Sequence, residues 1–141
     1  MIFDDLPYNP FPVFSRRLMV RPYTHEDLPQ MAARHAETAW EVLSPREALE
    51  AAQENLMRYH SLSARREIVV GGFSLADGRT LMAHFNAVAI GPGIWDVGYY
   101  VPQVQRGQGV MAECLQVMKR AMGMMDARAL TAHPSCPSRA S

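Results

Sequence analysis

The hydrophobic and polar positions in the first part of the chain predict a strand and then a helix. Residues 16–23 (RRLMVRPY) form a short β-rich run, and residues 24–43 carry apolar side chains at helical spacing. Thr24 and Asp27 are both suitable N-caps, and acidic residues occupy the first turn. The pattern therefore predicts an amphipathic helix directly after the strand.

A second helix is predicted over residues 44–62, where three start signals agree. Ser44 is a suitable N-cap, Pro45 stands at the first helical position, and Glu47 completes a capping box with Ser44. The chain is thus expected to place two helices after its first strand.

Three β-rich runs follow, separated by gaps of the size of a turn. Residues 66–75 and 79–90 flank Asp77-Gly78, a pair typical of hairpin turns. The sequence Gly-Pro-Gly at 91–93 then interrupts the pattern before the third run, residues 94–101. Consecutive strands with such short connections predict an antiparallel meander.

The rest of the chain predicts a helix and one more strand. A turn with two glycines precedes a helix over 109–125, and residues 127–133 (ARALTAH) form the last β-rich run. This succession favours a parallel crossover. The order β-α-α-β-β-β-α-β predicts the α/β (α+β) class, with a mixed, mainly antiparallel sheet flanked by helices. Residues 1–14 are expected to form a surface tail, and residues 15–141 a single domain.

The predicted helix 109–125 combines a broad apolar face with a narrow polar one. The apolar face, which includes several methionines and Cys114, is assigned to core packing rather than to a binding groove. The polar stripe is expected to face water and consists of Glu113, Gln116, Lys119 and Arg120.

Charge and cysteine content exclude several classes of function. Fourteen Lys and Arg balance fourteen Asp and Glu, so the broad positive surface of a nucleic-acid-binding protein is not expected. No apolar run approaches the roughly eighteen residues of a membrane span, and acids stand near the start where a signal peptide is basic. A cytoplasmic protein without a membrane partner is expected. Cys114 and Cys136 lack the paired spacing of a zinc site, so no metal is expected.

The sequence between residues 106 and 111, RGQGVM, is the part of the chain that packing explains least. A helix start presents unpaired backbone N–H groups and a partial positive charge. Gly107 and Gly109 leave these groups unshielded, and Arg106 adds a guanidinium suited to phosphate. Pyrophosphate is therefore the first candidate ligand, although glycines also occur here simply to turn the chain.

Two nucleotide-binding motifs partly resemble the same residues. A P-loop is excluded because no Gly-Lys-Ser/Thr follows. The pattern Gly107-x-Gly109-x-x-Ala112 matches the dinucleotide fingerprint, but the glycines are not flush with the preceding strand. The candidate ribose-binding acid, Asp126, also precedes the next strand instead of following it. A dinucleotide-binding domain is accordingly disfavoured.

The stretch DVGYYVPQVQRGQGVMAECL resembles motif A of the GNAT N-acetyltransferases, Arg/Gln-x-x-Gly-x-Gly/Ala. It is most similar to the branch that acetylates the N-termini of ribosomal proteins, where a strand GYW-x-x-P leads to GKG-x-x-x-EA. The residues in register are Gly98, Tyr99, Pro102, Gly107, Gly109 and Glu113. SRRLMVRPYTHEDLPQM likewise resembles the opening strand and helix of that branch, so the resemblance covers roughly residues 15–139.

The resemblance implies acetyl-coenzyme A as cofactor and an amine as acceptor, either a small molecule or a protein N-terminus. The pyrophosphate would lie on the backbone amides of Arg106, Gly107, Gln108, Gly109, Val110 and Met111. The pantetheine arm would bond to the backbone of Tyr100 and Val101, where the preceding strand is splayed from its neighbour by a bulge. One N–H there, assigned to Val101, would polarise the thioester carbonyl.

Asp96 is the candidate general base, because the resemblance places it at the family's acidic position two residues before Gly98. The alternative is a solvated strand aspartate. His84 is assigned to a half-buried strand position rather than to catalysis. Tyr99 and Tyr100 should face opposite sides of their strand, one toward a cleft and one toward the core.

The chain also departs from the family pattern. Met111 stands where the motif usually has Gly or Ala, and a side chain that points inward would leave its amide free. Cys136 stands where an Asn is usual. Family members continue with a further helix and strands that cover the far edge of the sheet. Without these elements, the last strand here is expected to have an open edge. A homodimer could cover that edge. The alternative function is therefore a non-catalytic coenzyme-A-binding or structural remnant of the same fold.

Overall fold

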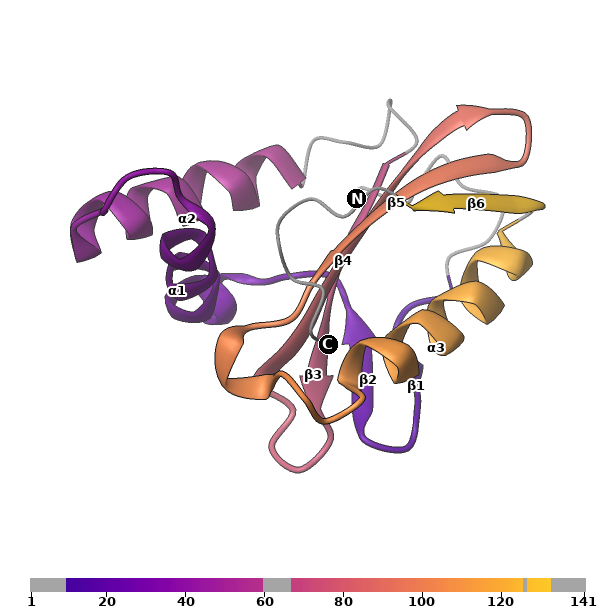
Figure 1. Cartoon of the computed structure of the whole chain (residues 1–141), viewed down its shortest axis with the longest axis horizontal. Coiled ribbons are helices and arrows are strands. Elements are labelled where there is room, and N and C mark those ends of the chain that lie inside the picture. The colour runs from indigo at the N-terminus through magenta and orange to yellow at the C-terminus, as the bar shows by residue number, and fades with distance from the viewer. Residues whose placement is uncertain (1–9, 60–66, 126, 133–141) are drawn as a thin grey trace.

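The computed structural model describes residues 10–59, 67–125 and 127–132, which form one six-stranded sheet and its helices (Figure 1). The strands are β1 (Val13–Phe14), β2 (Leu18–Arg21), β3 (Glu67–Ser74), β4 (Leu81–Gly91), β5 (Ile94–Tyr100) and β6 (Ala129–Ala132). The helices are α1 (Leu28–Thr38), α2 (Pro45–Tyr59) and α3 (Val110–Met124), with short 3₁₀ helices η1 (His25–Asp27) and η3 (Gln103–Gln105). The predicted fold class and element order are confirmed. The added strand, β1, lies in the segment predicted as a tail.

The strands follow one another in the sheet in the order β1-β2-β3-β4-β5-β6. All neighbours are antiparallel except β5 and β6, which run parallel because α3 carries the chain back between them. Figure 1 shows α1 and α2 on one side of the sheet and α3 on the other. The middle six of the eight residues of β3 are buried, as expected for a strand covered on both faces.

Both early helices begin with the predicted caps. The Ser44 N–H donates to Glu47 Oε1 (2.9 Å), and the Glu47 N–H donates to Ser44 Oγ (3.1 Å), which is a complete capping box. Thr24 and Asp27 form the same arrangement around η1, so the chain enters α1 through a 3₁₀ turn. α1 ends at Thr38, earlier than the periodic segment predicted, because the next residue adopts extended backbone.

Three connections lie at one end of the sheet. The register pairs Leu18 with Ser74, Phe73 with Leu81, and His84 with Tyr100. The β1–β2 turn, the β3–β4 hairpin and the glycine turn after β5 are therefore at the same end (Figure 1). The predicted Asp77-Gly78 turn is present there, with the Gly78 N–H donating to the Ser74 carbonyl (2.7 Å).

The apolar face of α3 packs against the sheet, as its pattern predicted. Cys114 and Met118 are fully buried, and they belong to a core that continues through β2, β3, β4 and β5. Burial in this apolar core raises the pKa of the Cys114 thiol to about 12. The prediction that Cys114 serves core packing is confirmed, whereas Cys136 lies outside the described residues.

Candidate functional site

The turn between β5 and α3 has the shape that its two glycines allow. Gly107 has φ +82°, and Gly109, the N-cap of α3, has φ +71°. Both are left-handed conformations that a side chain would disfavour. A carbon added at Gly107 would meet nothing within 4 Å, so this part of the turn is open. The turn thus presents backbone, rather than side chains, to its surroundings.

The first residues of α3 turn their side chains inward. Val110 and Met111 are 1% and 2% exposed, although the three residues before them, Gly107 to Gly109, are exposed. The amides at this end have no acceptor within the helix, and the helix dipole adds a partial positive charge. Bare glycines, inward side chains and unpaired amides fit a phosphate group. The sequence expectation that Met111 points inward agrees with this burial.

Arg106 lies against the end of β5. Its Nε donates to the Val101 carbonyl (2.9 Å), and its guanidinium carbon is 5.3 Å from the centre of the Tyr100 ring. The guanidinium is therefore held between the strand end and the turn. Val101 itself is buried, and the assignment of its N–H to a thioester carbonyl stays a prediction.

The two neighbouring tyrosines of β5 face opposite sides, as expected from strand alternation. Tyr100 is buried, and its hydroxyl donates to the carboxylate of Glu37 in α1. The same carboxylate accepts the N–H of Gln103 (3.1 Å). Tyr99 is half-buried and packs on the main core. Glu37, which sequence reasoning missed, thus links α1 to the segment that leads into the glycine turn.

Asp96 lies in the middle of β5, on the side of the strand that borders β6. Thr131 of β6 is its partner in the parallel register, and the Thr131 hydroxyl donates to Asp96 Oδ1 (2.7 Å). At about 3.3 Å per residue, Asp96 is about 13 Å along the strand from Tyr100. The carboxylate is thus held on the strand that leads into the glycine turn, but well removed from the turn itself.

The ladder between β5 and β6 covers Ile94 to Val97 of β5. Register irregularities occur between Gly72 and Phe73 and between Ala89 and Gly91 in the described sheet. Both irregularities lie in other strand pairs, so the bulge expected between β5 and the next strand at Tyr100 and Val101 stays a prediction.

Glu113 corrects one sequence expectation. Instead of facing water, its carboxylate accepts the Arg17 N–H and Arg17 Nε, each at 2.7 Å, and the hydroxyl of Ser15. Partial burial opposes ionisation, but these hydrogen bonds outweigh it and hold the pKa of Glu113 below its usual value. Arg17 also donates to the carbonyl of Gln108 in the glycine turn (3.0 Å). No local sequence signal indicated this contact.

His84 is buried, with 5% of its surface exposed, rather than half-buried as expected from the sequence, and its contacts agree with a structural role. Its Nδ1 lies 2.7 Å from the Tyr23 hydroxyl, and the two rings stack with centroids 5.7 Å apart. Burial, with a smaller contribution from Arg34, lowers the pKa of His84 well below its usual 6.5. Burial likewise raises the pKa of Tyr23. The imidazole is therefore neutral in the folded protein.

Lowering the pH from 6.5 to 5 should reduce the free energy of unfolding by up to about 2 kcal/mol through His84. The folded pKa lies below the unfolded one, so the unfolded chain takes up the proton first, at about 1.4 kcal/mol per pH unit. Urea unfolding between pH 7 and 5 measures this loss. His84→Gln should flatten the dependence, and exposed His25→Gln should not. Equal pH dependence in the native chain and His84→Gln would refute the assignment.

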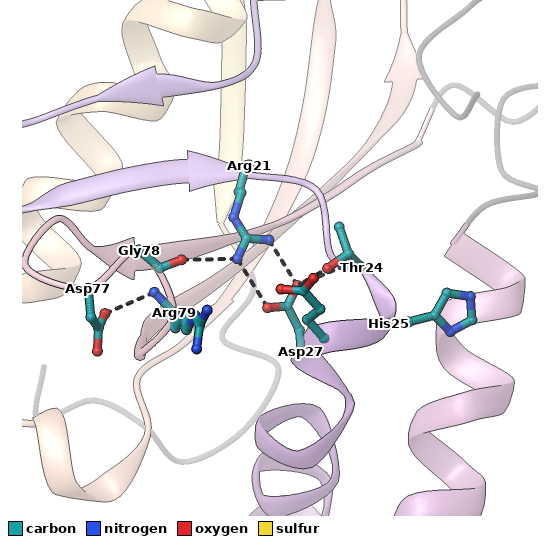
Figure 2. Close-up of a pocket in the computed structure, with 8 residues that line it drawn as sticks. Arg21, Thr24, His25, Asp27, Asp77, Gly78 and Arg79 are labelled. Atoms are coloured by element: carbon teal, nitrogen blue, oxygen red, sulfur yellow. Dashed lines mark hydrogen bonds and ion pairs between the residues drawn. The ribbon is translucent and has the colours of Figure 1, made fainter.

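An open pocket lies beside η1 and the β3–β4 hairpin (Figure 2), and none of the residues that line it belongs to the glycine turn. Two of the charged side chains that line it, Arg21 and Asp27, satisfy each other. Arg21 and Asp27 form a two-pronged ion pair of 2.9 and 3.1 Å, and Arg21 also donates to the Gly78 carbonyl. The Asp77 carboxylate accepts the Arg79 N–H (2.8 Å) within the hairpin. These contacts assign the pocket to holding the hairpin against η1.

Within the described residues, no group of three or more His, Cys, Asp or Glu side chains is arranged to hold a metal ion. None of the helices described is long and apolar enough to cross a bilayer.

Comparison with known proteins gives a family match over most of the chain. A model described as the acetyltransferase (GNAT) domain matches residues 17–140. A search of curated proteins finds no match.

Solved structures with a similar fold include ribosomal-protein acetyltransferases. The enzyme RimL, described as a ribosomal L7/L12 alpha-N-protein acetyltransferase in complex with coenzyme A, has a TM-score of 0.62 and 18% identity; the alignment covers 86% of this chain and 72% of RimL. A ribosomal-protein-S5-alanine acetyltransferase from Vibrio fischeri gives a TM-score of 0.59 and 15% identity, covering 85% of this chain and 72% of that one. At these identities the likeness establishes the fold.

Proposed function

Since this chain belongs to the GNAT acetyltransferase family, we propose that it transfers an acetyl group from acetyl-coenzyme A to a primary amine. The observation that carries the proposal is the glycine turn at the start of α3, where exposed backbone meets a helix N-terminus. This arrangement suits the pyrophosphate of the coenzyme. Amides from Arg106 to Met111 would bind it, and Arg106 would add positive charge.

The chain's own residues have separate roles in this proposal. When bound, acetyl-coenzyme A supplies an activated thioester carbonyl that the amine attacks directly, so that a carbon–nitrogen bond forms, the carbon–sulfur bond breaks and coenzyme A leaves as the thiol after its sulfur takes up a proton. The backbone of Tyr100 and Val101 would orient the pantetheine arm along β5, and an N–H there would stabilise charge on the carbonyl oxygen. Asp96 would accept a proton from the ammonium group of the acceptor, directly or through water.

The acceptor is proposed to be the α-amino group of a protein N-terminus. Two of the structures similar in fold are described as acetylating the N-terminus of a ribosomal protein, L7/L12. The glycine turn itself does not discriminate between acceptors, because it contacts only the coenzyme in this proposal. Small amines are therefore the comparison class in an acceptor screen.

Replacing Gly109 with tryptophan should weaken binding of acetyl-coenzyme A by at least about 100-fold. A side chain at Gly109 would begin 4.0 Å from Arg17 Nη2, so the indole would displace this guanidinium and the turn that it contacts, and φ +71° would strain any side chain. Titration calorimetry of the native chain and the variant measures the effect. Gly123→Trp is the matched control, because Gly123 is exposed in α3 and a carbon there meets nothing within 4 Å.

Two outcomes would contradict the proposal. Native affinity in Gly109→Trp would remove the coenzyme from the glycine turn. A folded native chain that fails to bind acetyl-coenzyme A would exclude the proposed function as a whole. Binding of the coenzyme without acetylation of any N-terminal peptide or small amine would instead favour a non-catalytic coenzyme-A-binding protein.

A further inference from the structure

We infer that Arg17 is a positioning residue for the coenzyme. It holds the backbone of the glycine turn from the side opposite the proposed phosphate site, and it neutralises Glu113 beside that site. The inference rests on the proposed function. Its basis is a single guanidinium that reaches two parts of the turn and helix at once. Arg17 Nε donates to Glu113 Oε1 (2.7 Å), and Arg17 Nη2 donates to the Gln108 carbonyl (3.0 Å).

The bond to Gln108 sets the direction of an amide that faces the ligand side. A trans peptide is planar, so its carbonyl and the following N–H point in opposite directions. Holding the Gln108 carbonyl toward Arg17 therefore directs the Gly109 N–H away from Arg17. A carbon added at Gly109 would lie 4.0 Å from Nη2, which is an ordinary contact distance, so the guanidinium lies on the side to which a side chain at Gly109 would point. Arg17 thus orients the Gly109 N–H without occupying the side of the turn that is open to a ligand.

The bond to Glu113 removes an electrostatic conflict. Glu113 lies in the first turn of α3, where an uncompensated carboxylate would repel a phosphate bound to the helix N-terminus. The Arg17 backbone N–H and Nε and the Ser15 hydroxyl all donate to this carboxylate. Ser15 Oγ in turn accepts the Leu18 N–H (3.1 Å), which fixes the network to the start of β2. The carboxylate is thereby paired and turned toward β2.

The two effects separate in a set of variants. Arg17→Ala removes both the hydrogen bond to the Gln108 carbonyl and the charge that compensates Glu113, and it should weaken coenzyme A binding by at least about tenfold. Adding Glu113→Gln to Arg17→Ala should recover part of this loss, because the repelling charge is then absent. Arg17→Lys keeps the charge but cannot fork between Glu113 and Gln108, so an intermediate loss of about threefold or more is expected.

Titration calorimetry with coenzyme A measures these affinities, and chemical-shift titration with S-acetylpantetheine supplies a second readout. S-acetylpantetheine carries the reactive arm without a pyrophosphate, so its weak binding should be unchanged in Arg17→Ala. General distortion of the fold would weaken both ligands. The control is Arg16→Ala, which removes the same charge from an exposed neighbour and should leave both affinities at the native value.

The outcomes distinguish this inference from the proposed function. If Arg17→Ala binds coenzyme A with the same affinity as the native chain, the role of Arg17 alone is overturned. If the alanine variant does not fold, native affinity in Arg17→Lys overturns that role in the same way. Equal loss of coenzyme A and S-acetylpantetheine overturns it too. A folded native chain that binds no coenzyme A overturns the proposed function and this inference together.

Discussion

Asp96→Asn is expected to lower kcat at least about 100-fold while leaving the affinity for acetyl-coenzyme A near the native value. A positioned general base typically contributes about 100- to 10,000-fold, and the amide cannot accept the proton of an ammonium group. Asparagine can still accept the hydroxyl of Thr131, so the local hydrogen bond and the β5–β6 pairing are retained. A large loss in kcat alone would therefore report on proton transfer rather than on folding.

Release of the free thiol during acetylation of a peptide with an unblocked N-terminus measures this rate. Asp77→Asn is the control, because this carboxylate lies in the β3–β4 hairpin and its hydrogen bonds stay within the hairpin. Thr131→Val should cost far less than Asp96→Asn if Thr131 only orients the carboxylate. Native kcat in Asp96→Asn would show that Asp96 is a structural strand residue and that the base lies elsewhere.

Asp27→Ala is expected to lower the free energy of unfolding by about 3 kcal/mol or more. Removing one partner of a buried ion pair leaves the other charge buried without compensation. Asp27 is 2% exposed and holds both terminal nitrogens of Arg21, whose guanidinium lies 3.7 Å from the centre of the Phe73 ring. The substitution also removes the acceptor of the Thr24 N–H at the start of η1 (2.7 Å).

Chemical denaturation of the native chain and the variant tests this loss. Glu50→Ala is a suitable control, because it breaks an ion pair with Arg46 that is exposed on α2, and such pairs contribute less than about 1 kcal/mol. Similar losses in the two variants would mean that burial of the Arg21–Asp27 pair adds nothing to stability.

Local sequence signals were sufficient to predict most of the fold. The Ser44, Pro45 and Glu47 signals define the start of α2, because a capping box depends on residues three positions apart. Alternating apolar runs and Asp77-Gly78 likewise predicted the meander correctly. β1 was not predicted, since its two residues provide too short a run for periodicity to detect.

In the candidate site too, the sequence predicted the features that depend on neighbouring residues and missed the contacts between distant ones. The glycine turn and the inward Met111 follow from the chain within a few residues, so the sequence indicated them. The Arg17–Glu113 contact joins residues 96 positions apart, and a helix pattern alone assigned Glu113 to water. The Glu37 contact with Tyr100 likewise joins residues 63 positions apart, one in α1 and one in β5. Pairings of this kind arise from the tertiary fold and leave no local signature.

The network around Glu113 also bears on where the domain can be shortened. The family match begins at residue 17, so a fragment trimmed to it keeps Arg17 but loses Ser15 and all of β1. The predicted boundary at residue 15 retains Ser15 and still removes β1, which pairs with β2. Fragments for crystallisation or fusion should therefore start before Val13, so that the edge strand and the support of the glycine turn are both preserved.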